Sequence, residues 1–142
     1  MKLTFKNDTF KILQIADTQE GRKVSPDTLE LINADLDREE PDLVVYSGDQ
    51  IWGRGFHGDV NQVRRVLKEL TAPVVERHLP FAICFGNHDR QVGLDNRAQF
   101  EIYKAIPGVI GEDPPGGDGG GNCVVEIADG DRPGYLLYLI DS

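Results

Sequence analysis

The sequence predicts an α/β fold with a mainly parallel sheet flanked by helices, formed by residues 1–142 as a single domain. Three apolar runs, at 10–16, 42–46 and 81–85, have the length and composition of buried strands. Longer amphipathic segments lie between them. Strands that alternate with amphipathic helices form parallel sheets through right-handed crossovers, so this order of elements predicts the architecture.

Three helices are predicted from their caps and from the spacing of their apolar residues. The first covers 25–40, where a Ser-Pro pair suits the start of a helix. The second covers 59–78, either kinked at Pro73 or divided there into two segments. The third covers about 96–105. Each has one apolar face that we expect to pack against the sheet.

The remaining elements are predicted from alternation and from turn residues. Residues 3–5 alternate apolar and polar side chains, and with 10–16 they predict an N-terminal hairpin. The Gly- and Pro-rich segment 111–121 predicts a flexible loop that does not pack. Two final strands, 123–127 and 135–140, are expected to pair with each other.

The charge balance argues against binding to a nucleic-acid backbone. The net charge is −9, and the 15 basic residues are scattered, with adjacent pairs only at Arg22-Lys23 and Arg64-Arg65. A protein that binds phosphate backbones needs a basic stripe. Most of the excess carboxylates are expected to be solvated surface groups, although they are also compatible with binding a cation.

The chain shows no segment that predicts a membrane or secretory location. No apolar run approaches the length of a membrane helix, and the N-terminus lacks a signal-peptide core. We therefore expect a cytoplasmic protein, although a mature secreted form would look the same. Cys84 and Cys123 both lie in apolar runs, which favours two buried free thiols over a disulfide.

Polar side chains follow all three predicted parallel strands. The first strand ends at Asp17, the second at Asp49, and the third at Asn87, His88 and Asp89. Ligands of open α/β sheets bind outside the carboxyl ends of the strands, so these side chains are expected to share one crevice. Taken singly, each aspartate is as well explained by an ordinary cap or turn.

This donor set suits a divalent metal such as Mn, Fe(II) or Zn. Two such metals, bridged by a carboxylate, can clamp a phosphate and activate a water. His88 is then placed to protonate a leaving oxygen, and Asp89 to hold the imidazole in the required tautomer. The glycines before these groups, Gly48 and Gly86, allow sharp turns and close approach of a ligand.

These blocks resemble the calcineurin-like metallophosphoesterases, and within them the purple acid phosphatase-like branch. The resemblance rests on the segments at 15–17, 41–51 and 85–89, which follow the family's order over nearly the whole chain. It implies the N-terminal half of a four-layer α/β/β/α sandwich. It also implies two divalent metal ions (Mn, Fe or Zn) and a phosphate-ester substrate.

The resemblance also implies a role for each matching residue. Asp17 would bind the first metal, Asp49 would bridge the two metals, and Asn87 would bind the second. His88 would contact the phosphate and assist the leaving group, oriented by Asp89.

The chain departs from the family pattern at two ligand positions and in its later motifs. Gln19 stands where the family has a metal-binding histidine, and we expect it to form hydrogen bonds, with metal ligation as the alternative. Trp52 stands where the purple enzymes have a tyrosine ligand, and it cannot bind a metal. No histidine follows His88, so the histidine-rich later motifs are absent and the domain looks truncated.

The departures predict weak metal affinity and little or no phosphatase activity for this chain alone. The alternative is a degenerate, non-catalytic metallophosphoesterase fold that binds a metal or a partner. A missing half of the sheet would leave apolar surface and a strand edge exposed, which favours self-association.

Two other groups have open roles. His57 is expected to be a solvated loop residue, with substrate contact or replacement of a missing ligand as the alternative. Arg90 is expected to form an exposed salt bridge, with contact to an anionic substrate as the alternative.

Overall fold

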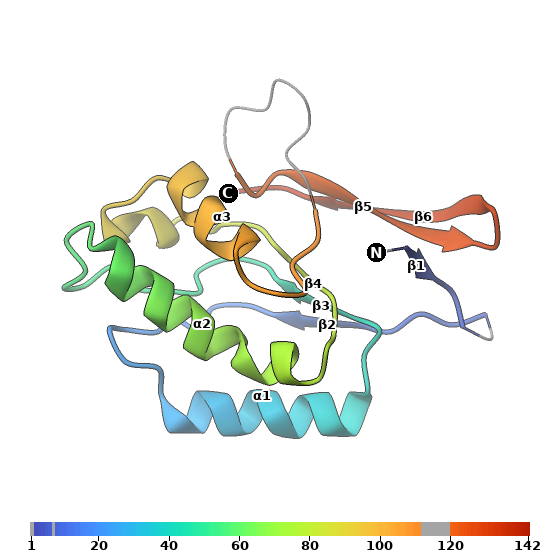
Figure 1. Cartoon of the computed structure of the whole chain (residues 1–142), viewed down its shortest axis with the longest axis horizontal. Helices are drawn as coiled ribbons and strands as arrows, with labels where there is room; N and C mark the ends of the chain where they lie inside the picture. Colours follow the sequence, from blue (N-terminus) through green and yellow to red (C-terminus); the bar gives the residue numbers. More distant parts are fainter. Residues whose placement is uncertain (1, 7, 112–119) are drawn as a thin grey trace.

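The computed structural model describes residues 2–6, 8–111 and 120–142, which form two three-stranded sheets and three α-helices (Figure 1). The helices are α1 (Pro26–Glu39), α2 (Val60–Glu76) and α3 (Asn96–Lys104), with a short 3-10 helix η1 (Asp89–Val92). The helices lie on one side of the first sheet, and the second sheet lies on its other side (Figure 1).

The first sheet contains the three strands that were predicted to be parallel. They are β2 (Ile12–Ile15), β3 (Leu43–Tyr46) and β4 (Phe81–Ile83). All pairs are parallel and β3 is central, so the predicted α/β architecture is confirmed. The carboxyl ends of the three strands therefore meet at one edge of this sheet (Figure 1).

Alternate side chains of β3 are buried on opposite faces of the first sheet. Val44 and Tyr46 pack in a cluster with the helices. Leu43 and Val45 pack in a second cluster with residues of the other sheet. A strand buried on both faces must be apolar throughout, which explains why LVVY lacks the alternation of a surface strand.

The second sheet combines the start and the end of the chain. Its strands are β1 (Leu3–Thr4), β5 (Cys123–Asp129) and β6 (Arg132–Leu139), in the order β1-β5-β6. The β5 and β6 strands pair antiparallel, as predicted. β1 lies parallel to β5, with Leu3 opposite Ile127.

The predicted N-terminal hairpin is wrong. β1 and β2 lie in different sheets, and an isolated bridge between Lys6 and Thr9 is the antiparallel contact near the turn. Leu3 is buried between the sheets beside Ile127, which a pairing of β1 with β2 would not allow. Apolar packing between the two sheets therefore determines the position of β1. It outweighs the turn signal in the local sequence.

The helices begin where the sequence predicts, although Ser25 forms no side-chain hydrogen bond at the start of α1. Asp59 accepts hydrogen bonds from the N–H groups of Asn61 and Gln62, which explains the start of α2. α2 continues through Pro73 as one helix to Glu76. Among the described helices, none combines the length and the apolar character that a membrane crossing needs.

Most of the predicted loop 111–121 falls outside the described residues. Its last two residues are buried, so the expectation that the segment does not pack is wrong at that end. A Cβ on Gly120 would lie 2.1 Å from Cβ of Phe100, and one on Gly121 would lie 2.3 Å from Oδ1 of Asp141. Only glycine fits these positions without a shift of their neighbours.

Candidate metal centre

The loops after β2 and β3 are joined by main-chain hydrogen bonds. The N–H of Asp17 donates to the carbonyl of Gly48 (3.0 Å), and the N–H of Gln19 donates to the carbonyl of Asp49 (2.9 Å). The two aspartates predicted to bind metal therefore lie on adjacent backbone segments. This arrangement follows from the parallel pairing of their strands.

The loop after β4 reaches the same place through Asp49. The N–H of His88 donates to Oδ1 of Asp49 at 2.8 Å. Gly86 lies against the same carboxylate, because an added Cβ there would lie 2.2 Å from Oδ1 of Asp49. Asn87 lies between these two contacts, so its backbone is placed beside Asp49. The structure thus brings together the three loops that the sequence predicts to converge.

Three residues of this cluster have left-handed backbone conformations. Asp17 has φ of 54°, Gln19 of 45° and Asp49 of 54°. Such conformations are uncommon for residues other than glycine, and each costs on the order of 1–3 kcal/mol. Their clustering at the strand ends is typical of a functional site, where surrounding contacts hold the backbone in place.

Close packing of two glycines allows the second and third loops to approach. Gly48 has φ of 112°, and a Cβ at this position would lie 2.8 Å from the backbone nitrogen of Gly86. Neither position accommodates a side chain without moving backbone. The sharp turn expected at Gly48 is therefore present, and the two glycines allow the loops to approach each other. The close approach of a ligand stays a prediction.

Asp89 holds the backbone of the Asp49 loop. Its carboxylate is 1% exposed, and it accepts four hydrogen bonds from backbone N–H groups. The donors are Asp49 (2.8 Å), Gln50 (2.9 Å), Ile51 (3.2 Å) and Gly86 (2.8 Å). Burial raises the pKa of Asp89, and these hydrogen bonds oppose that shift.

The predicted orientation of His88 by Asp89 is wrong in this structure. Both carboxylate oxygens of Asp89 are engaged by backbone N–H groups. Nδ1 of His88 is buried and has no hydrogen-bond partner among the described residues. Because neighbouring residues in a 3-10 turn point in different directions, adjacency in sequence does not bring these two side chains together.

The candidate ligands differ in exposure. Asp49 is 8% exposed, whereas Asp17, Gln19 and Asn87 are exposed and free to meet a ligand. Within residues 2–6, 8–111 and 120–142, no three His, Cys, Asp or Glu side chains form a metal-binding group. A metal at this place therefore depends on amide oxygens or water in addition to the carboxylates. Such an all-oxygen set fits a hard cation such as Mn²⁺ better than Zn²⁺.

Comparison with known proteins identifies the family. The chain matches the family described as calcineurin-like phosphoesterase over residues 10–138. It belongs to the calcineurin-like phosphoesterases. Phosphatase DCR2 of Saccharomyces cerevisiae is 31% identical over 156 residues, which cover 94% of this chain and 26% of that protein.

Two further relatives show a similar partial overlap. "Probable inactive purple acid phosphatase 14" of Arabidopsis thaliana is 27% identical, over 89% of this chain and 36% of that protein. The crystal structure of a dimetal phosphatase from Danio rerio aligns with a TM-score of 0.46 and 23% identity, over 58% of this chain and 30% of that one. The chain spans only about a quarter to a third of the length of these relatives.

Other residues of this calcineurin-like phosphoesterase support the site and were missed in the sequence. The Asp141 carboxylate accepts hydrogen bonds from the N–H of Phe85 (2.8 Å) and from Nδ2 of Asn96 (3.0 Å). Nε2 of Gln99 donates to the carbonyl of Asp89 at 3.0 Å. The sequence contained a signal that could have identified Asp141 as a site residue, because it directly follows a predicted strand, as Asp17 does.

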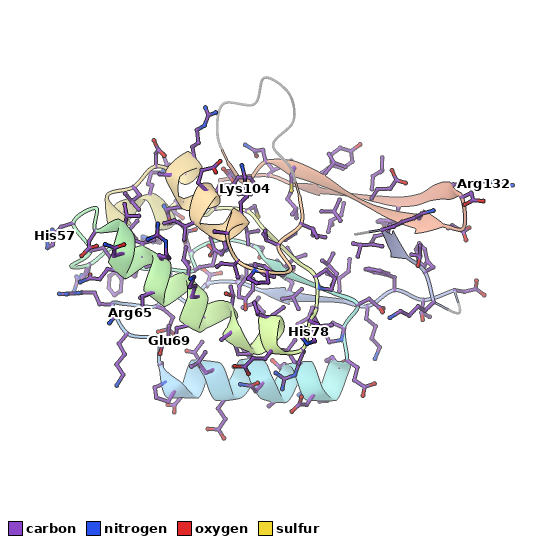
Figure 2. All side chains as sticks on the ribbon, viewed as in Figure 1. His57, Arg65, Glu69, His78, Lys104 and Arg132 are labelled. Atoms are coloured by element: carbon purple, nitrogen blue, oxygen red, sulfur yellow. The ribbon has the colours of Figure 1, made fainter. Side chains whose placement is uncertain are left out.

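His57 and His78 lie at opposite ends of α2, whereas His88 lies in the loop after β4. Figure 2 places His57 on the loop before α2 and His78 just after that helix. Cys84 and Cys123 are both buried and form no disulfide, as predicted. Burial raises the pKa of Cys84, which keeps the thiol protonated.

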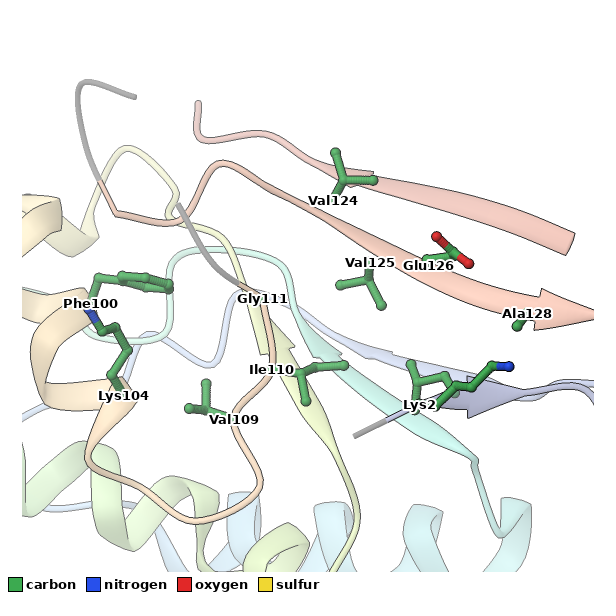
Figure 3. A pocket seen from close by; sticks show the side chains of 11 residues that line it. Lys2, Phe100, Lys104, Val109, Ile110, Gly111, Val124, Val125, Glu126 and Ala128 are labelled. Atoms are coloured by element: carbon green, nitrogen blue, oxygen red, sulfur yellow. The ribbon is translucent and has the colours of Figure 1, made fainter. Parts of the chain in front are cut away.

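A cavity of about 930 Å³ lies away from the candidate ligands (Figure 3). Phe100 and Lys104 of α3 line one side, and Val125 and Glu126 of β5 line the other. None of the described residues that line it is a candidate metal ligand. A smaller cavity, of about 350 Å³, lies between β2 and α1 and includes Asp17.

Proposed function

We propose that this chain binds a divalent metal at the ends of β2, β3 and β4, and that the site serves hydrolysis of phosphate esters. The observation that carries the proposal is the joining of the three loops around Asp49. The family is one of phosphoesterases, which supports a phosphate ester as the substrate. Turnover by this chain alone is proposed to be weak or absent.

Four side chains would hold the metal, and a fifth would assist the reaction. Asp17, Asp49 and Asn87 would provide oxygen ligands, with Gln19 as an additional amide at the position where an imidazole is missing. When bound, a divalent metal supplies a Lewis acid and an activated water. His88, held by its N–H against Asp49, would donate a proton to the leaving alcohol oxygen.

The metal is proposed to be Mn²⁺, or another cation that accepts oxygen ligands. Carboxylates and amides are the donors available, and imidazole or thiolate ligands are what Zn²⁺ prefers. Fe(II) and Zn²⁺, the other metals implied by the resemblance, have less preference for an all-oxygen set. With few protein ligands we propose that one metal binds, completed by water.

A non-catalytic function is the second candidate, and a specific observation favours it. Gln19 stands where the family has a metal-binding histidine, so this position beside Asp49 offers a neutral amide in place of an imidazole. In this case the fold would bind a metal or a partner without turnover. The two candidates agree on the metal and differ in whether a bound phosphate ester is hydrolysed.

Calorimetric titration with Mn²⁺, followed by a phosphomonoester assay, tests both candidates. We expect Mn²⁺ to bind, and Asp17→Asn or Asp49→Asn to weaken binding at least about tenfold, since each removes a charged ligand. Asp129→Asn is the matched control, because Asp129 is an exposed aspartate at the end of β5. Unchanged affinity in both ligand variants would reject the metal site.

Gln19→His tests the missing ligand, and hydrolysis separates the enzymatic and non-catalytic candidates. Restoring an imidazole is expected to raise the affinity for Zn²⁺, since imidazole is a preferred zinc ligand. Hydrolysis by the unchanged chain favours the enzyme, and binding of metal without hydrolysis favours the second candidate. Robust turnover would contradict the prediction that this chain is weak or inactive.

We also propose self-association through the outer face of the second sheet. The apolar side chains of Val124, Leu136, Tyr138 and Ile140 are between 44% and 72% exposed. Exposed apolar clusters of this kind are typical of interaction surfaces. Sedimentation velocity at rising concentration tests the proposal, with Tyr138→Lys expected to shift the chain to monomer. A monomer at all concentrations would contradict it.

A further inference from the structure

The loops that carry the candidate ligands also carry exposed arginines. Arg22 follows Asp17 by five residues, and Arg54 follows Asp49 by the same distance. The third loop repeats the pattern with Arg90, three residues after Asn87. All three arginines are exposed, although the chain has a net charge of −9. Each of the three loops therefore presents an exposed guanidinium group in addition to its carboxylates.

Contacts between the loops bring these arginines to one region. A Cβ on Gly55 would lie 3.2 Å from Cδ of Arg22, so this side chain lies over the loop that holds Arg54. A Cβ on Gly53 would lie 2.1 Å from the carbonyl carbon of Gln91, the residue after Arg90. The segment 52–58 is thus in contact with the other two loops.

Helix α2 adds a further arginine at the same end. Nη2 of Arg65 donates to the carbonyl of Arg22 at 2.7 Å. Figure 2 shows Arg65 and His57 at the same end of the molecule, with Arg132 at the opposite end. We call Arg22, Arg54, Arg65 and Arg90 the arginine rim.

The guanidinium groups of the rim have no salt bridge with any residue of the described part of the chain. The salt bridge expected for Arg90 is therefore not formed there. Two carboxylates of the same loops accept hydrogen bonds from backbone N–H groups instead. Glu20 accepts from the N–H of Ser25, and Asp59 caps α2. Arg54 instead lies over the ring of Trp52, 4.5 Å from its centroid.

We infer that the arginine rim binds acidic residues that flank the phosphorylated group of a peptide substrate. Arginine is the preferred partner for carboxylates and phosphates, because its planar donors match their geometry. The inference rests on the proposed phosphoester function, and it specifies the class of substrate. The phosphate would enter among the strand ends while the flanking carboxylates meet the rim.

The exposure and limited extent of the rim favour a short acidic peptide over other anions. Small molecules bind in concave pockets, whereas these side chains lie on exposed loops. A long nucleic acid would meet the acidic remainder of the surface, which carries the net charge of −9. A short acidic segment covers only the three loops and meets less of that acidic surface.

Fluorescence anisotropy with labelled peptides tests the inference. One probe carries a central phosphoserine flanked by glutamates, a second replaces these glutamates with glutamines, and a third keeps them but has unmodified serine. We expect the glutamate probes to bind about tenfold more tightly than the glutamine probe at low salt. The difference should shrink at high salt, because exposed charges are screened.

Two triple variants with the same change of charge locate the effect. Arg22→Gln/Arg54→Gln/Arg90→Gln is expected to remove the preference for glutamate. The control, Lys2→Gln/Arg38→Gln/Arg132→Gln, removes three exposed cations outside the rim and should keep it. Circular dichroism verifies that both variants fold. Equal binding of the glutamate and glutamine probes, or equal loss in both variants, would overturn the inference.

Two further measurements separate the rim from the metal site and from a nucleic-acid site. Peptide binding is measured in EDTA, so that a failed metal site does not affect the result. Preference for glutamate without metal supports the rim even if the phosphoester function is wrong. A short single-stranded DNA competes as a second class of polyanion. If it binds more tightly than the glutamate probe, the rim is a nucleic-acid site and the peptide assignment is wrong.

Discussion

The two sheets of this phosphoesterase differ in how their faces are covered. The β2–β3–β4 sheet has helices on one face and the second sheet on the other, and its central strand is fully buried. The β1–β5–β6 sheet is covered on its inner face, whereas outward side chains such as Tyr138 are 63% exposed. The candidate metal ligands all follow strands of the first sheet, and contacts between their loops can hold the strained backbone conformations.

Removal of the Asp89 carboxylate should give the largest effect and tests whether the edge of the first sheet depends on one side chain. Asp89→Ala leaves four buried N–H groups without an acceptor, which should lower the free energy of unfolding by more than about 4 kcal/mol. Urea unfolding measures this. Asp89→Asn, which keeps the shape, should lose less and should still weaken Mn²⁺ binding.

An exposed carboxylate provides the control for Asp89. Asp59 accepts from two backbone N–H groups at the start of α2, and Asp59→Ala should cost only about 1 kcal/mol. Similar losses in Asp59→Ala and Asp89→Ala would show that the strand-end loops hold their shape without Asp89.

Truncation of two leucines in β6 tests the two faces of the second sheet. Leu139 is 6% exposed on the inner face, and Leu139→Ala should cost about 3 kcal/mol through lost burial and a cavity. Leu136 is 44% exposed on the outer face, and Leu136→Ala should cost less than about 1 kcal/mol. If both substitutions destabilise the fold equally, Leu136 is buried in solution, and the outer face of the second sheet is then covered.

A methyl group at Gly86 tests the contact between the loops at the candidate site. Gly86→Ala places Cβ 2.2 Å from Oδ1 of Asp49 and should cost about 2 kcal/mol as the carboxylate moves. Mn²⁺ affinity should fall with it. Gly21→Ala is the control, because nothing lies within 4 Å of an added Cβ there. Unchanged Mn²⁺ binding in Gly86→Ala would place the metal away from Asp49.

The parts that sequence predicts well are those that depend on local pattern. Apolar runs, caps and the polar residues at strand ends identify β3, α2 and the loops around Asp49, because each signal lies within a few residues. The pairing of β1 with β5 joins the two ends of the chain, and no local signal encodes it.

The role of Asp89 shows a different limit of prediction from sequence. A carboxylate next to His88 suits either an imidazole or a set of backbone N–H groups, and only the backbone path of Asp49 decides between them. The burial of Gly120 depends in the same way on Phe100, which is distant in sequence.

Alkaline pH should give the smallest effect, and it separates the tyrosines of the two regions. Tyr46 and Tyr103 are buried in the helix-covered cluster, and burial raises the pKa of both, as it does for Cys84. The folded state keeps these protons while the unfolded state releases them, so stability is full below the unfolded pKa values and falls as the pH rises. Between pH 8 and pH 9.5 the loss should be about 1 kcal/mol.

Absorbance of tyrosinate in a Tyr135→Phe/Tyr138→Phe variant measures the ionisation of this buried pair. The variant removes the two exposed tyrosines of β6, so the remaining signal comes from Tyr46 and Tyr103. We expect the absorbance to rise together with the loss of the circular dichroism signal, because these hydroxyls ionise only when the helix-covered cluster opens. An absorbance change that precedes unfolding would show that this cluster is open to water, and that the first sheet is no better protected than the second.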